Sequence, residues 1–89
     1  PEYNGGLPPV WSNFLAWMSK SGDDFRHAFN GKKAAIMSFS GSGSNVLPFM
    51  RLQLAYLGMT IMGRQLLANY EKPAKTDSID AILDGLMNA

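Results

Sequence analysis

The chain has 89 residues, of which 46% are hydrophobic and 17% are charged, so it suits one small folded domain and not a disordered chain. Its charges are scattered and the formal net charge is +1, which favours neither nucleic acid nor an anionic membrane as a partner. It has no cysteine and no apolar run of about 18 residues, so we expect a soluble, cytoplasmic protein without disulfides or a membrane span.

Two prolines open the first predicted element. Pro8 and Pro9 suit a helix start, because their fixed φ is helical and the missing N–H would have no partner there. Apolar residues then recur at helical spacing from Pro9 to about Lys20. They predict one wide apolar face made of Val10, Trp11, Phe14, Leu15, Trp17 and Met18. Residues 21–32 form a polar connector whose His27 we expect to face solvent, because no cysteine or second histidine accompanies it as a metal ligand.

A short apolar run marks the first predicted strand. Residues 33–39 are bounded by glycine, too few for a helix, and apolar at successive positions, which predicts a buried parallel strand. Small residues follow at 40–45 and predict a loop that can bring backbone N–H groups close to a ligand. Residues 46–57 keep the helical period, with Ser44 or Asn45 as the cap and Gly58 as the stop.

The rest of the chain predicts a second strand and a last helix. Residues 59–67 read as a strand, weakened at Gly63, and residues 69–78 as a linker. An amphipathic helix follows at 79–87. This alternation predicts an α/β fold with a parallel sheet. Two strands leave an open edge, so we expect further strands before the first residue.

Three segments together resemble a known family. PEYNGGLPP, SNFLAW and GKKAAIMSFSGSGS are similar to the second half of the NAD(P)H-dependent FMN reductases, which have a flavodoxin-like fold. The resemblance runs from Pro1 to about Gln65. It implies a three-layer parallel sheet, of which residues 1–89 form a single partial domain, the C-terminal half in the order loop-α-β-α-β-α. The phosphate-binding loop of the family would then lie upstream.

The resemblance also implies a flavin site with FMN as cofactor and NADPH or NADH as reductant. The residues that it places against the flavin ring are Pro1, Glu2, Tyr3, Asn4 and Gly5 in the first loop and Ser40, Gly41, Ser42 and Gly43 in the second. Ligands of open parallel sheets do bind beyond the carboxyl ends of the strands, and an aromatic ring offers a flat apolar wall. We expect no catalytic acid or base, because the cofactor carries the chemistry, and no metal site, because the chain has one histidine and no cysteine.

The function that the resemblance implies is hydride transfer from a nicotinamide to bound flavin, in an FMN reductase or a quinone-type oxidoreductase that is a homo-oligomer. The 89 residues alone should be inactive. Two alternatives remain open: a flavin-binding electron carrier without reductase turnover, and a non-enzymatic interaction module that uses the strand edges and the tryptophan-bearing helix. A dinucleotide fingerprint at GSGSN is weak, because Val46 stands where the third glycine would be.

Overall fold

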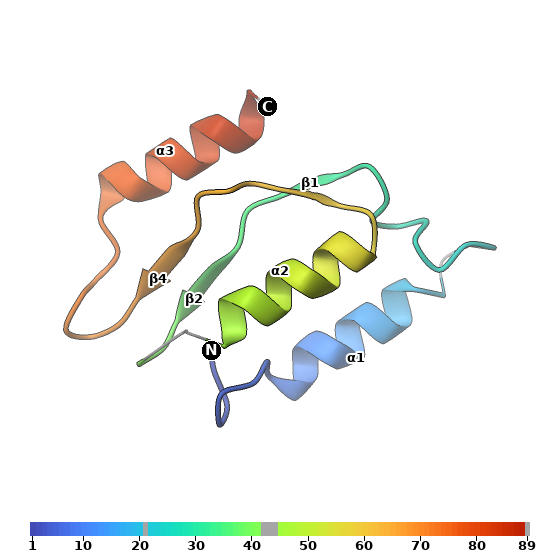
Figure 1. Cartoon of the computed structure of the whole chain (residues 1–89), viewed down its shortest axis with the longest axis horizontal. Helices are drawn as coiled ribbons and strands as arrows, with labels where there is room; N and C mark the ends of the chain where they lie inside the picture. Colours follow the sequence, from blue (N-terminus) through green and yellow to red (C-terminus); the bar gives the residue numbers. More distant parts are fainter. Residues whose placement is uncertain (21, 42–44, 89) are drawn as a thin grey trace.

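Figure 1 shows the computed structural model of the chain, which describes residues 1–20, 22–41 and 45–88. Within these residues the predicted order of helices and strands is confirmed, and the fold is α/β. The elements are α1 (Pro9–Met18), β1 (Lys33–Ala34), β2 (Met37–Phe39), α2 (Val46–Tyr56), β3 (Thr60–Ile61), β4 (Leu66–Ala68) and α3 (Thr76–Met87).

The strands form two short parallel ladders, as the alternation of elements predicts. β1 pairs with β3, and β2 pairs with β4. Each predicted strand is therefore interrupted: 33–39 becomes β1 and β2, and 59–67 becomes β3 and β4. The register shifts at the break, because Lys33 faces Thr60 whereas Met37 faces Leu66. The second strand thus carries two more residues between its ladders than the first.

A side chain from α2 forms hydrogen bonds with the residues between β3 and β4. Arg51 donates through Nη1 to the Met62 carbonyl oxygen at 3.0 Å and through Nη2 to Gln65 Oε1 at 2.9 Å. A longer contact of 3.4 Å joins Nη2 to the carbonyl oxygen of Gly63. The guanidinium group thereby satisfies backbone oxygens that the shifted register leaves outside the ladders. We call residues 62–65, which lie between β3 and β4, the bulged segment. Gly63, which weakens the strand pattern, lies in it.

Helices cover both faces of the strand pair. Ile61 packs against the core beneath α1 and α2, whereas the next residue, Met62, reaches Gly85 of α3. Successive strand residues point to opposite faces, so α3 lies on the face away from α1 and α2. Figure 1 shows the strands running between α2 and α3. The core lies between α1, α2 and the strands and consists of Leu15, Phe29, Ile36, Leu47, Leu54 and Leu57.

The first helix is shorter and less buried than its pattern predicts. It ends at Met18, where the Ser19 hydroxyl donates to the Leu15 carbonyl oxygen at 2.7 Å. Leu15 is buried, and two half-buried neighbours, Trp11 and Met18, pack against the core. The remaining apolar positions of the predicted face point away from the core and are exposed, namely Val10, Phe14 and Trp17.

The other two helices form where they are predicted, but their ends differ. α2 stops as expected, because Gly58 takes the left-handed conformation with φ +88°. Asn45 occupies the N-cap position but makes no side-chain capping hydrogen bond, and Ser44 lies outside the described residues. α3 begins at Thr76, three residues earlier than predicted.

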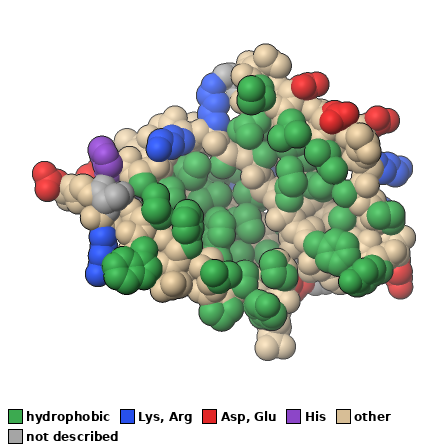
Figure 2. Space-filling model, turned by 180° about the vertical axis from the view of Figure 1, so that it is seen from behind, with side chains coloured by type: hydrophobic (Ala, Val, Ile, Leu, Met, Phe, Trp, Pro, Cys, Tyr) green, Lys and Arg blue, Asp and Glu red, His purple; other side chains and the backbone are tan. Residues whose placement is uncertain are grey.

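Two predictions about burial are wrong. Met37 and Phe39 in β2 are 40% and 50% exposed, so the first strand is not buried on both faces. Figure 2 shows hydrophobic side chains gathered across the face seen from behind. The polar connector also contributes to the core, because Phe29 is buried.

His27 is exposed, as predicted. No helix in the described part of the chain is long and apolar enough to cross a membrane.

Candidate functional site

The carboxyl ends of two neighbouring strands meet at one edge of the molecule. β2 ends at Phe39 and β4 ends at Ala68, and their parallel pairing brings both ends to the same side. The Ser40 N–H donates to the Ala68 carbonyl oxygen at 2.9 Å, which extends the ladder one step further. The segments that follow these strands therefore start side by side, where ligands of parallel sheets bind.

The first loop is a tight two-residue turn. Tyr3 and Gly6 exchange both backbone hydrogen bonds, at 3.0 and 2.9 Å. The central residues Asn4 and Gly5 both have positive φ, +51° and +79°. An Asn-Gly pair is the preferred sequence for a turn of this kind, because these two residue types tolerate the left-handed conformation best. The Asn-Gly pair was the sequence signal for this geometry.

This turn lies against the start of α2. A Cβ atom built on Gly5 would come within 3.2 Å of Asn45 Nδ2. The backbone of the turn therefore approaches the Asn45 side chain more closely than an alanine would comfortably allow. Instead of capping its own helix, Asn45 contacts the first loop. The first loop that the resemblance places against a flavin ring therefore meets the N-terminus of α2 at this point.

A hydrogen bond joins the same two loops near the strand ends. The Ser40 hydroxyl donates to Glu2 Oε1 at 2.7 Å. Ser40 is buried and Glu2 is half-buried, so the bond lies in a partly dry environment. A hydrogen bond that a carboxylate accepts is stronger than one between two neutral groups. It fixes the first loop relative to the end of β2.

The structure thus brings together some of the predicted site residues and leaves others apart. Glu2 contacts Ser40, and Gly5 approaches Asn45, whereas Pro1, Tyr3, Asn4 and Gly41 are exposed. Ser42 and Gly43 lie outside the described residues. A Cβ at Gly41 would meet none of the described atoms within 4 Å.

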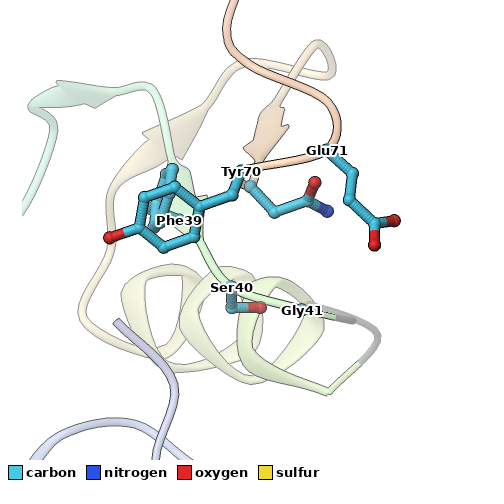
Figure 3. A pocket seen from close by; sticks show the side chains of 6 residues that line it. Phe39, Ser40, Gly41, Tyr70 and Glu71 are labelled. Carbon is cyan, nitrogen blue, oxygen red and sulfur yellow. The ribbon is translucent and has the colours of Figure 1, made fainter.

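A cavity of about 400 Å³ opens at this edge, beyond the ends of β2 and β4. Figure 3 shows its side chains, which come from both strand ends. The lining residues are Phe39, Ser40, Gly41, Asn69, Tyr70 and Glu71. Sequence reasoning assigned residues 69–71 to a linker and so missed them. Their position directly after a parallel strand was the signal, because such strands end at a common edge.

This edge of the molecule presents polar and aromatic side chains. Its described side chains are hydroxyl, amide, aromatic and carboxylate groups, and the carboxylate of Glu2 already accepts a hydrogen bond from Ser40. Among the described residues, no three histidine or acidic side chains cluster to hold a metal ion. The arrangement can present hydrogen-bonding groups and aromatic surface to a flat ligand.

Comparison with known proteins identifies a family. The family model described as NADPH-dependent FMN reductase matches residues 1–72. The matched range includes both loops and the segment after β4, and it extends past the end of the resemblance seen in the sequence. No curated protein and no solved structure matches the chain.

Proposed function

Because this chain belongs to the NADPH-dependent FMN reductase family, an oxidoreductase family of flavodoxin-like fold, we propose that it is the C-terminal part of an NAD(P)H-dependent flavin reductase of the cytoplasm. The proposed reaction transfers a hydride from NADPH or NADH to bound FMN. When bound, FMN supplies the redox chemistry, since it takes up an electron pair and passes it to an acceptor. Residues 1–89 then contribute binding and orientation.

One observation carries this proposal: the hydrogen bond between Ser40 and Glu2. It ties the first loop to the carboxyl end of β2, although the two residues are far apart in the sequence. The same pair of loops is the one that the family resemblance places around a flavin ring. Their meeting at the strand ends agrees with the general position of ligands in parallel sheets.

The residues take binding roles in this proposal. Tyr3 offers an exposed aromatic face, and Asn4 and the backbone of Gly41 offer hydrogen-bonding groups to the polar edge of the ring. Glu2 acts through Ser40 and holds the two loops together. The remaining proposed contacts are Pro1, Gly5, Ser42 and Gly43. No side chain is assigned as a catalytic acid or base.

The strand pair supports the proposal that the chain is part of a larger domain. Within the described residues, β1 pairs only with β3 and β2 only with β4, so the outer edges of both ladders are open. An open edge next to exposed apolar side chains such as Met37 and Phe39 is a poor end for a sheet. We propose that further strands complete the sheet and that the 89 residues alone are inactive.

The outer surface of α2 supports a homo-oligomer. Phe49, Leu52 and Tyr56 point away from the core on this helix and are exposed. A groove of about 530 Å³ runs beside them, with Leu7, Ser12 and Gln53 completing its lining. α2 is therefore apolar on its inner and its outer face, which is typical of a helix that is covered on both sides. A second copy of the protein would cover the outer face.

An FMN titration tests the proposed function. FMN is added to residues 1–89 and to the longer protein of which we propose that they are a part. Quenching of flavin fluorescence reports binding. NADPH is then added, and bleaching of the flavin absorbance reports reduction. Binding and bleaching in the longer protein support the reductase. Binding without bleaching indicates an electron carrier, and no binding by either form favours an interaction module.

A further inference from the structure

An aromatic corner stands beside the proposed flavin loops. Phe39 is the last residue of β2, and Tyr70 lies two residues after the end of β4. Their rings meet edge to face, with ring centroids 5.1 Å apart and an interplanar angle of 87°. Tyr70 is nevertheless 94% exposed. Burial therefore explains little of its position. Figure 3 shows both rings on the rim of the 400 Å³ cavity described above.

The turn that carries Tyr70 is closed by hydrogen bonds. The Asn69 N–H donates to the Lys72 carbonyl oxygen at 3.0 Å, and the Lys72 N–H donates to Asn69 Oδ1 at 2.7 Å. Tyr70 and Glu71 occupy the tip of this turn. A tip fixed at its base holds an exposed ring in place without burying it. Such preorganisation lowers the entropy lost when a ligand binds.

The charge of the cavity selects among flat ligands. Among the described residues that line it, Glu71 is the only charged one, and its carboxylate lies on the rim. A negative charge at this position disfavours ligands that carry phosphate or sulfonate groups, which includes free FMN and the nicotinamide dinucleotides. The aromatic corner and the volume of about 400 Å³ suit a small ring system without charge.

We propose that this cavity binds a neutral, flat aromatic ring and serves as the site of the electron acceptor. This inference rests on the proposed function and deepens it. Ser40 and Gly41 line the cavity and also belong to the second flavin loop, so a ring bound here lies next to that loop. With a quinone as acceptor, NADPH, one proton and the quinone give NADP⁺ and the hydroquinone. Both carbonyl oxygens of the quinone become hydroxyl groups, and two electrons are transferred.

Steady-state kinetics of the FMN-loaded longer protein test the inference, with menadione as the neutral probe. Tyr70→Leu should raise the KM for menadione about tenfold, because one wall of the aromatic corner is lost. Tyr70→Phe keeps the ring and should stay within about twofold of the parent. The KM for NADPH should not change in either variant. An unchanged KM for menadione in Tyr70→Leu would overturn the inference.

The charge argument has its own matched pair of probes. 1,4-Naphthoquinone-2-sulfonate has nearly the same ring as menadione but carries a negative charge. Glu71→Gln should lower the KM for the sulfonate several-fold and leave that for menadione unchanged. Equal changes for both probes would show that the rim charge does not select the ligand, and the assignment to a neutral ring would fall.

A binding experiment separates this inference from the proposed function. Amide chemical shifts of the flavin-free longer protein are followed by NMR during a menadione titration. Shifts concentrated at Phe39 and at residues 69–71, and lost in Tyr70→Leu, support the site even if the protein does not reduce FMN. The absence of shifts there rejects the site. Loss of FMN binding and bleaching in the preceding titration would instead reject the proposed function.

Discussion

Ser38 and Ser40 differ in whether their buried hydroxyl groups have a hydrogen-bond partner. Both side chains are about 8% exposed and belong to the same stretch at the end of the first strand. Ser40 donates a hydrogen bond to Glu2, whereas Ser38 Oγ has no hydrogen-bond partner in the described part of the chain. A buried hydroxyl without a partner costs free energy, and one bonded to a carboxylate contributes to stability.

Replacing each serine by alanine should therefore give opposite results. Ser40→Ala should lower the free energy of unfolding by about 1–3 kcal/mol, because the bond to the Glu2 carboxylate is lost. Ser38→Ala is the matched control and should leave the free energy of unfolding unchanged or raise it slightly. Urea denaturation followed by circular dichroism measures both. Equal losses in the two variants would contradict the role given to the Ser40–Glu2 bond.

The first loop offers a second test at the scale of one residue. Gly5 combines φ +79° with a close approach to Asn45, so Gly5→Ala should cost about 1–2 kcal/mol of stability. At Gly6 an added Cβ would meet the Tyr3 carbonyl oxygen at 3.4 Å, an ordinary contact, so Gly6→Ala serves as the control. Thermal unfolding of the two variants separates them. A stable Gly5→Ala protein would mean that the turn can rearrange freely.

At the scale of elements, the break between the ladders depends on α2. Arg51 reaches the carbonyl oxygens of the bulged segment, so it links the crossover helix to the strand that follows it. Its forked guanidinium makes several of these bonds at once, which a single ammonium group could not do with the same geometry. The register of β4 against β2, and hence the position of the strand end at the candidate site, is held in part by this contact.

Arg51→Met should lower the free energy of unfolding by about 1–3 kcal/mol, because it leaves backbone oxygens of the bulge without a donor. Amide hydrogen exchange should accelerate first at residues 62–66. Arg64→Met is the control, since Arg64 makes one exposed contact of 3.4 Å to Ser78 and should change stability by less than about 0.5 kcal/mol. If both variants lose the same stability, Arg51 does not hold the bulge.

Local patterns predicted the elements better than their details. The helix at 46–57 was predictable because apolar spacing and Gly58 mark its core face and its end. The split of each strand was not, because it depends on a contact between Arg51 and a segment distant in sequence. Phe29 joins the core from a connector without periodicity, so no pattern could place it.

The candidate site was predictable only in part. The two loops were expected at one ligand because of the family resemblance, and the structure brings Glu2 and Ser40 together. The Asn4-Gly5 pair is a sequence signal for a tight turn that the sequence analysis did not use, and the approach of this turn to Asn45 depends on the packing of the whole chain. Residues 69–71 looked like a linker because their polar composition resembles one. Only the parallel pairing of β2 and β4 shows that they line a cavity.

At the scale of the whole molecule, the outer face of α2 predicts the assembly. Leu52 is 69% exposed on this face, and Leu52→Glu should place a charge in the proposed contact between copies. The longer protein should then shift from oligomer to monomer in size-exclusion chromatography with light scattering. Met87→Glu, on α3 at the opposite side of the strands, is the control and should leave the assembly intact. An unchanged oligomer in Leu52→Glu would show that copies meet elsewhere.

The proposed flavin site depends on the whole molecule, and an FMN titration of the longer protein tests it. We expect quenching of flavin fluorescence on binding, about tenfold weaker binding in Ser40→Ala, which loses a contact that joins the two loops, and bleaching of the bound flavin by NADPH. Residues 1–89 alone should bind FMN weakly or not at all. If the longer protein neither quenches nor bleaches FMN, the loops at this edge do not form a flavin site and the reductase assignment is contradicted.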